Sequence, residues 1–287
     1  MELVHAVADL KQLVERKKSE GLSVGFVPTM GALHEGHLSL VAEASKASGY
    51  VVVSIFVNPT QFNDKKDLER YPRNLGLDME LLKSTSCDLV FAPGVDEMYP
   101  VEDTRLFNFG SLETVMEGKH RPGHFNGVAQ VVSKLFDMVQ PDFAFFGEKD
   151  FQQLAIIKAM SRQLNLDVKI VPCKTVREPN GLAMSSRNQL LSDAQRESAA
   201  LISETLFGAQ EKMDKMPVAE LKQWVMDTIN KDENLEIEYF DIVNSDTLQS
   251  VNSWDEKVNK TGCIAVHCGR IRLIDNVTFS KNVDRSL

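Results

Sequence analysis

The first part of the chain alternates short apolar runs typical of β-strands with segments of helical periodicity. Apolar runs at residues 23–27 and 50–57 flank a helical segment at residues 38–47, which predicts a βαβ unit. Because the alternation continues, a doubly wound, Rossmann-like parallel α/β sheet is the best account. The other elements expected here are helices at 6–18, 74–83, 128–139 and 151–164 and strands at 88–92, 142–146 and 168–171.

Turn residues follow the predicted strands. Right-handed crossovers place the carboxyl ends of parallel strands at one edge of a sheet. We therefore expect the loops after the strands to converge at that edge. The residues expected just after strands are Pro28, Asn58-Pro59, Pro93, Gly147 and Pro172.

The composition changes after residue 176, where a loop rich in Gly, Ser and Asn begins. The elements expected beyond this loop are helices at 192–213, capped by Ser192, and 218–230, entered through Pro217, and strands at 236–243, 261–268 and 270–274. We therefore predict two domains, residues 1–175 and a smaller α+β domain at residues 176–287.

Charge and composition argue against several classes of protein. Lys and Arg total 32 against 41 Asp and Glu, a net charge of −9, so the chain lacks the basic surface that nucleic-acid binding needs. The four cysteines include no C-x-x-C pair and are expected to be reduced. The N-terminus lacks signal-peptide features, and the apolar runs are too short to cross a bilayer. We expect a cytoplasmic protein with neither nucleic acid nor membrane as a partner.

The segment P-T-M-G-A-L-H-E-G-H, residues 28–37, is the strongest functional signal. It lies between a predicted strand and a predicted helix, where α/β sheets bind nucleotides. A helix N-terminus offers N–H groups and a partial positive charge to phosphate, and Gly36 allows a ligand close to the backbone. Because His34 and His37 are three residues apart, both rings face the same way and can donate hydrogen bonds to phosphate oxygens.

Alternative roles for the two histidines are weaker. A zinc-protease motif needs two His four residues apart, and a P-loop needs G-x-x-x-x-G-K-[ST], which is absent. Two ordinary surface histidines remain an alternative. The phosphate site is favoured because two of the six His lie in one stretch of four residues, within a strand-to-helix turn.

Gly147-Glu148-Lys149-Asp150 follows the predicted strand at 142–146. Lys149 can place a positive charge on a phosphate, and Gly147 permits close approach to the backbone. A plain charged helix start is the alternative, but the segment lies at the same sheet edge as the two histidines.

Met184-Ser185-Ser186-Arg187-Asn188 lies in the loop that enters the second domain. Two hydroxyls and a guanidinium can bind the oxygens of a polyphosphate. By itself the segment fits a solvated turn equally well.

Six segments in order, from about residue 20 to residue 192, resemble the pantothenate synthetase (pantoate–β-alanine ligase) family. They are P-T-M-G-A-L-H-E-G-H, S-I-F-V-N-P-T-Q-F, R-Y-P-R, R-P-G-H-F-N-G-V, F-F-G-E-K-D-F-Q-Q-L and V-R-E-P-N-G-L-A-M-S-S-R-N. This family shares its HIGH-type motif with class I aminoacyl-tRNA synthetases. The resemblance implies a reaction in which pantoate and MgATP give pantoyl adenylate and pyrophosphate, and β-alanine then releases pantothenate and AMP.

The resemblance also implies roles for single residues. His34 and His37 contact the ATP phosphates, with His37 as the proton donor. The groups that hold the β- and γ-phosphates are Lys149, Ser185, Ser186 and Arg187. The implied ATP-binding residues are Met30, Gly31, Ala32, Leu33, His34, Glu35, Gly36, His37, Gly147, Glu148, Lys149, Asp150, Val176, Met184, Ser185, Ser186 and Arg187.

By the same resemblance, Gln61 and Gln153 bind the hydroxyls and carboxylate of pantoate, and a buried amide rejects analogues that lack the matching hydroxyl. The other implied pantoate contacts are the polar Asn58 and the apolar Pro28, Met30 and Phe62. Asp78 is the only carboxylate in the run at residues 74–78 after Y-P-R and a candidate Mg²⁺ ligand, with Mg²⁺ otherwise held by ATP. The basic segment at 117–126 is either an anion-binding flap or a solvated loop.

The resemblance further implies a homodimer through the first domain and a second domain that closes as a lid. Three alternatives stay open. Another HxGH adenylyltransferase with a phosphorylated acceptor would need Arg or Lys where Gln61 and Gln153 stand. A tRNA synthetase conflicts with the net charge of −9. An ATP-binding sensor would bind nucleotide without turnover, and it gives no reason for His34, His37, Lys149 and Arg187 to occur together.

Overall fold

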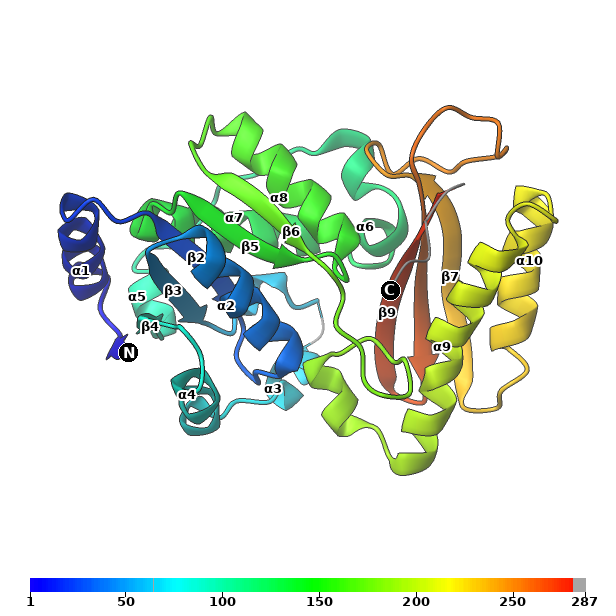
Figure 1. Cartoon of the computed structure of the whole chain (residues 1–287), viewed down its shortest axis with the longest axis horizontal. Coiled ribbons are helices and arrows are strands. Elements are labelled where there is room, and N and C mark those ends of the chain that lie inside the picture. Colours follow the sequence, from blue (N-terminus) through cyan, green and yellow to red (C-terminus); the bar gives the residue numbers. More distant parts are fainter. Residues whose placement is uncertain (64, 281–287) are drawn as a thin grey trace. The chain divides into compact units, whose positions relative to one another are not determined.

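The computed structural model describes residues 1–63 and 65–280, with only the backbone of Lys65. The chain packs into two compact units (Figure 1). The first contains Met1–Gly110, Arg121–Glu148 and Gln153–Val176, and the second contains Ser111–His120, Lys149–Gln152 and the chain from Arg177. The two short segments of the second unit were not anticipated by the division at residue 175. They join it through side-chain contacts such as that of the Gln152 amide, which accepts from the Glu117 N–H at 2.9 Å.

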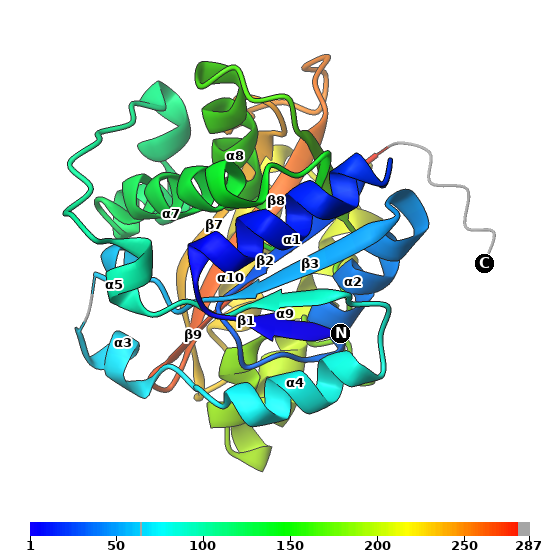
Figure 2. The same ribbon diagram turned by 90° about the vertical axis from the view of Figure 1, so that its left-hand side faces the viewer.

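The first unit is built on a six-stranded parallel sheet with the order β1-β4-β3-β2-β5-β6, which confirms the predicted α/β class. The strands are β1 (Glu2–Val4), β2 (Val24–Thr29), β3 (Tyr50–Ile55), β4 (Leu89–Phe91), β5 (Phe143–Gly147) and β6 (Lys169–Cys173). The helices are α1 (Val7–Ser19), α2 (Glu35–Ala47), α3 (Lys65–Arg70), α4 (Leu75–Lys83), α5 (Val95–Met98), α7 (His124–Val139) and α8 (Phe151–Gln163), of which Phe151 and Gln152 belong to the second unit. Helices α1 and α7 lie on one face of the sheet and α2 on the other (Figure 2).

The core of the first unit forms because its strands are short β-branched runs buried on both faces. Val51, Val53 and Val90 on β3 and β4 are fully or almost fully buried. Leu40, Val41 and Ala44 form the apolar stripe of α2 that packs on this sheet. The spacing of these residues sets which side of α2 faces the sheet.

The order of the strands creates a switch point between β2 and β5. From β2 the chain builds outward through β3 to β4, whereas from β5 it builds in the opposite direction to β6. In open α/β sheets, ligands bind beyond the carboxyl ends of the strands at such a point. The segment at 28–37 leaves β2 there and Glu148 leaves β5 there, so the sheet brings the first predicted motif and the Gly147-Glu148 start of the second to one edge.

Two prolines that were expected to follow strands lie inside them. Pro28 pairs with Ser54 of β3, but the pairing of β2 with β5 covers only Gly25 and Phe26, so Pro28 has no strand on its other side. Pro172 lies in β6, which is the last strand of the sheet. Proline lacks an N–H donor and is tolerated where a strand edge makes no ladder bond.

Several element limits differ from those expected. Gly147 is the last residue of β5 rather than the first residue after it. Helix α2 begins at Glu35 and α7 at His124, earlier than expected, because polar residues start each helix before its apolar stripe. The strand β1 and the short helices α3 and α5 were not predicted because they are only a few residues long.

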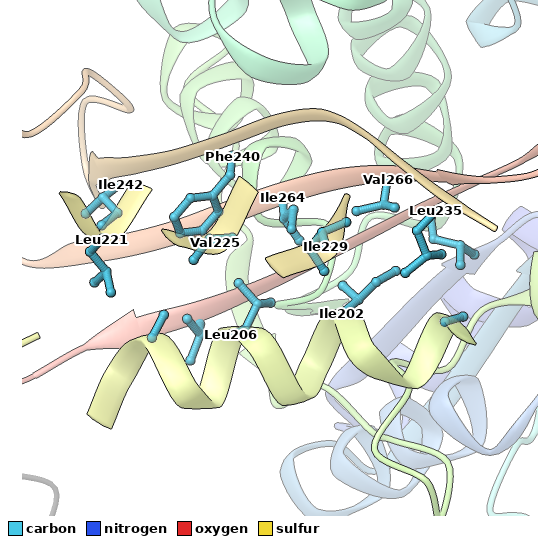
Figure 3. Close-up of a cluster of buried hydrophobic side chains, with 14 of the residues drawn as sticks. Ile202, Leu206, Leu221, Val225, Ile229, Leu235, Phe240, Ile242, Ile264 and Val266 are labelled. Carbon is cyan, nitrogen blue, oxygen red and sulfur yellow. The ribbon is translucent and has the colours of Figure 1, made fainter. Parts of the chain in front are cut away.

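The second unit contains the antiparallel sheet β7-β8-β9 and helices on it, which confirms the predicted α+β part. Its elements are α6 (Met116–His120), α9 (Asp193–Lys212), α10 (Val218–Ile229), β7 (Leu235–Asn244), β8 (Lys260–Cys268) and β9 (Ile271–Phe279), the last longer than expected. Ser192 caps α9 as predicted. Side chains of α9, α10 and the sheet, among them Leu206, Val225 and Ile264, form one buried cluster (Figure 3).

No helix in the described part of the chain is both long enough and apolar enough to span a membrane.

Candidate active site

The turn between β2 and α2 has an unusual backbone. Gly31 and Ala32 have φ of 76° and 49°, in the left-handed region. The hydroxyl of Thr29 accepts from the Gly31 N–H at 3.2 Å. A Cβ at Gly31 would lie 2.9 Å from a carboxylate oxygen of Asp78, so glycine is needed for space as well as for φ. The shape of this turn therefore depends on Gly31 and on the hydroxyl of Thr29.

Asp78, on α4, holds this turn. Its Oδ2 accepts from the Ala32 N–H at 3.1 Å and its Oδ1 accepts from the Leu33 N–H at 2.7 Å. The side chain is 3% exposed, and burial raises the pKa of Asp78, with the two backbone hydrogen bonds opposing the shift. Both oxygens thus bind backbone groups, a role that the sequence did not indicate. Its role as a Mg²⁺ ligand stays a prediction.

The two histidines of the HxGH motif lie side by side, with ring centroids 4.1 Å apart. His34 is the N-cap of α2, and its Nδ1 accepts from the Gly36 N–H at 3.1 Å. The Nδ1 of His37 accepts from the His34 N–H at 3.3 Å. Because each Nδ1 accepts, the proton of each neutral ring lies on Nε2. The arrangement places two Nε2–H donors at the start of a helix.

A second turn, η1 (Pro59–Gln61), follows β3 and carries Gln61. The side chains of Asn58 and Gln61 are almost completely buried, at 1% and 7% exposed. Nδ2 of Asn58 donates to Oε1 of Gln61 and to the Gly127 carbonyl, both at 3.1 Å. Nε2 of Gln61 lies 3.1 Å from Sδ of Met30. The structure thus brings Gln61 to the turn that carries the histidines, whereas the amide of Asn58 bonds to protein groups.

The remaining residues predicted in the first unit are half-buried. Gln153 lies on α8, and its side chain makes no hydrogen bond with the described residues. Its neighbour Gln152 is buried and structural, since it donates to two backbone carbonyls of the segment before α6. Phe62 packs edge-on against Tyr71 at 5.7 Å. A Cβ at Gly147 would meet no described atom within 4 Å, so the end of β5 is open to a ligand.

The second unit holds the other predicted phosphate ligands. Lys149 has a side chain that is 17% exposed, and its carbonyl accepts from Asn276 of β9 at 3.0 Å. Asp150 lies 4.0 Å from the ammonium of Lys149. These contacts order the short segment that follows β5.

Ser185 begins the turn η3 (Ser186–Leu190), and its hydroxyl accepts from the Arg187 N–H at 3.3 Å. Asn188 anchors this turn, because its Nδ2 donates to Glu178 at 2.7 Å and to the Ala183 carbonyl at 3.1 Å. The loop that presents Met184, Ser185, Ser186 and Arg187 is therefore internally hydrogen-bonded. This order was not predicted from its composition.

His124 contacts the backbone of Gln61, although it was not part of the site predicted from the sequence. Its Nδ1 lies 2.8 Å from the Gln61 carbonyl, which can only accept, so Nδ1 carries the proton. The guanidinium of Arg121 then donates to Nε2 at 3.1 Å. The available signal was the position of His124, four residues before Val128 on the apolar face of α7. The segment at 117–126 is thus not simply a solvated loop, since Glu117 and His124 are buried.

The family model described as pantoate-beta-alanine ligase matches residues 2–278. The chain belongs to this family. A pantothenate synthetase from Bacteroides thetaiotaomicron is 52% identical over 98% of this chain and 100% of its own length. One from Porphyromonas gingivalis strain W83 is 50% identical over 97% of this chain and 99% of its own.

Solved pantoate–β-alanine ligases share the fold. The pantothenate synthetase of Thermus thermophilus is 43% identical, with a TM-score of 0.90, and the match covers 96% of this chain and 99% of that one. The pantoate–β-alanine ligase of Francisella tularensis, in a complex with "beta-gamma ATP" and β-alanine, is 34% identical with a TM-score of 0.80 over 98% and 99%.

Proposed function

We infer that this chain condenses pantoate with β-alanine to pantothenate in an ATP-dependent reaction that passes through pantoyl adenylate and releases AMP and pyrophosphate. The observation that carries this conclusion is the match to the pantoate–β-alanine ligase family along residues 2–278. The enzyme is a ligase that activates one acid and joins it to the amine of another.

The reaction has two displacements. A carboxylate oxygen of pantoate attacks the α-phosphorus of ATP, and the bond from this phosphorus to the oxygen of the leaving pyrophosphate breaks. The amine of β-alanine then attacks the acyl carbon, and AMP leaves. Because the pantoate carboxylate is already ionised near pH 7, the first step needs no general base. It needs alignment of the reacting groups and donors that stabilise charge on the phosphate oxygens.

His34 and His37 supply such donors in our proposal. Their Nδ1 atoms accept from backbone N–H groups, which supports Nε2–H as the group that faces phosphate. A preorganised donor of this kind contributes about 100-fold to 1,000-fold to a rate. His37 is assigned to the charge that develops in the transition state.

Gln61 and Gln153 bind the hydroxyls and carboxylate of pantoate in this proposal. The buried Gln61 beside Met30 supports this role, since a rigid amide selects for a hydrogen-bonding partner. Met30, Pro28 and Phe62 supply apolar surface for the two methyl groups of pantoate.

The phosphates that leave as pyrophosphate are assigned to Lys149, Ser185, Ser186 and Arg187. Adenosine is assigned to Gly147, Asp150, Val176 and Met184, with Asp150 accepting from the ribose hydroxyls. The open space at Gly147 and the hydrogen-bonded turn at Ser185 support these roles.

Magnesium enters with ATP, whose phosphate oxygens hold it and whose charge it partly neutralises. Among residues 1–63 and 65–280, no group of three or more His, Cys, Asp or Glu could hold a metal ion. Asp78, with both oxygens in backbone hydrogen bonds, fits a ligand role only partly. The homodimer, the cytoplasmic location and the role of residues 176–287 as a lid stay predictions.

The test is phosphorus NMR of the purified protein with MgATP and pantoate labelled with ¹⁸O in its carboxylate. With β-alanine present, we expect continuous release of AMP and pyrophosphate, with one ¹⁸O transferred to AMP. Without β-alanine, pyrophosphate should form to about one equivalent of enzyme and no AMP should be released, because the AMP group stays bound in pantoyl adenylate. ADP and phosphate would contradict the adenylate route, and nucleotide binding without turnover would favour the sensor.

A further inference from the structure

Tyr99 makes a hydrogen bond to the pantoate side of the candidate site, although it lies outside all the motifs discussed above. Its hydroxyl donates to Oδ1 of Asn58 at 2.8 Å. Tyr99 ends α5, in the connection that follows β4, and its ring packs 6.2 Å from that of Phe56. Burial raises the pKa of Tyr99, so its phenol stays a donor at neutral pH.

The backbone partners of the Asn58 amide show which of its two terminal atoms is the oxygen. The Thr60 N–H, which can only donate, lies 3.4 Å from Oδ1, and the Gly127 carbonyl, which can only accept, lies 3.1 Å from Nδ2. A reversed amide would set donor against donor and acceptor against acceptor. Oδ1 therefore faces Tyr99, and Nδ2 faces Gln61.

The orientation of Asn58 determines that of Gln61. Nδ2 of Asn58 donates to Oε1 of Gln61, so the Gln61 amide presents its Nε2–H on the other side, 3.1 Å from Sδ of Met30. A thioether sulfur is a weak acceptor. An oxygen of pantoate can therefore replace it at little cost, whereas a substrate group that only donates cannot.

The rest of this turn is held independently of Tyr99. His124 donates to the Gln61 carbonyl at 2.8 Å. A Cβ at Gly127 would lie 2.5 Å from the Thr60 carbonyl, so α7 touches the backbone of the turn. Oδ1 of Asn58 also accepts from the Thr60 hydroxyl at 3.1 Å, but the bond from Tyr99 is shorter, at 2.8 Å. Removal of the Tyr99 hydroxyl should thus loosen the Asn58 and Gln61 side chains in part, without moving the backbone.

We propose that Tyr99 is a positioning residue for pantoate, which acts through Asn58 to hold the Gln61 amide with its N–H toward the substrate. This proposal rests on the function inferred above. It replaces a direct contact of Asn58 with pantoate by an indirect one. The series of hydrogen bonds from Tyr99 through Asn58 to Gln61 makes the site selective for a substrate oxygen that accepts from Nε2 of Gln61.

The test is Tyr99→Phe, which removes only the hydroxyl. We expect the KM for pantoate to rise about threefold to tenfold, as for the loss of one net hydrogen bond, with the KM for ATP and kcat at saturation nearly unchanged. The matched control is Tyr50→Phe. Tyr50 is buried on β3 of the same unit, and its hydroxyl has no partner among the described residues, so its loss should leave the pantoate KM unchanged.

A double-mutant cycle separates positioning from general damage. In a Gln61→Ala background, Tyr99→Phe should have no further effect on pantoate binding measured by calorimetry. An additive effect, an equal rise in the KM for ATP, or an unchanged pantoate KM would each overturn the proposal. If the wild-type protein itself forms no AMP from pantoate, the proposed function fails. In that case a pantoate affinity that does not respond to Tyr99→Phe would overturn the positioning role as well.

Discussion

The backbone N–H of His34 donates to Nδ1 of His37 at 3.3 Å, so the first histidine of the motif orients the second. The same bond contributes to the N-terminal cap of α2, since His37 stands at the third helical position. This hydrogen bond thus caps the helix together with the His34 side chain, and it makes Nδ1 of His37 an acceptor, so that the proton of the neutral ring lies on Nε2. The cap of α2 therefore also fixes the ring orientation on which the proposed chemical role of His37 depends.

The first prediction concerns His37. His37→Ala should lower kcat about 100-fold to 1,000-fold with little change in ATP affinity, because a transition-state donor is lost. Rapid-quench measurement of pyrophosphate release checks this. His5→Ala, at an exposed position in the same unit, is the control and should keep the wild-type rate. A near-normal rate for His37→Ala would remove the assignment.

Gln61→Ala should weaken pantoate binding while ATP binding stays the same, because the lost amide faces only one substrate. Separate calorimetric titrations with pantoate and with a non-hydrolysable ATP analogue measure both. Unchanged pantoate affinity would refute the role of Gln61.

Lys149→Met should lower kcat/KM for ATP, because it removes the positive charge that we assign to binding the leaving pyrophosphate. Methionine keeps most of the length of this largely buried side chain. The control Lys174→Met changes an exposed lysine that follows β6. If both variants form the adenylate at the wild-type rate, Lys149 is only the charged start of a helix.

Asp78→Asn should lower both stability and kcat. An asparagine can accept from one of the Ala32 and Leu33 N–H groups but sets its own NH2 against the other, at a cost of about 1–3 kcal/mol in the free energy of unfolding. Urea unfolding and steady-state assays measure the two effects. Glu80→Gln, at an exposed position on the same helix, should change neither appreciably. Full activity of Asp78→Asn would mean that the turn holds its shape without this carboxylate.

The last prediction concerns alkaline pH. Burial, with smaller effects of Glu2 and Asp88, raises the pKa of Tyr50 from 10.0 to about 12. Between these values the folded protein keeps a proton that the unfolded chain has lost. The contribution of Tyr50 to stability is therefore complete below pH 10 and is lost as the pH rises through about 12. Tyr50→Phe should lose less stability than the wild type between about pH 8 and about pH 11.5 in urea titrations. Equal losses would contradict the prediction.

Local patterns in the sequence were enough to predict the βαβ unit, the capping Ser192 and the closeness of His34 and His37, because each depends on residues near one another in the chain. The contact of Asp78 with Ala32 and that of Tyr99 with Asn58 could not be predicted in this way. These pairs are 46 and 41 residues apart and meet only when α4 and α5 pack beside the sheet. Pro28 was wrongly predicted to follow β2 for a related reason. A proline can lie inside this strand only because β5 does not pair with β2 as far as Pro28.

The position of β2 between β3 and β5 also affects how the protein is made. One neighbour, β3, follows β2 closely in the chain, but the other arrives much later: the Val24 N–H bonds to Asp142, 118 residues away. The turn that carries His34 and His37 is therefore synthesised well before β5, which pairs with the other side of β2. Pairing over such a separation is slow to form, and it exposes β2 to wrong partners until β5 arrives. The sheet edge that carries the HxGH segment is thus complete only after β5 has been synthesised.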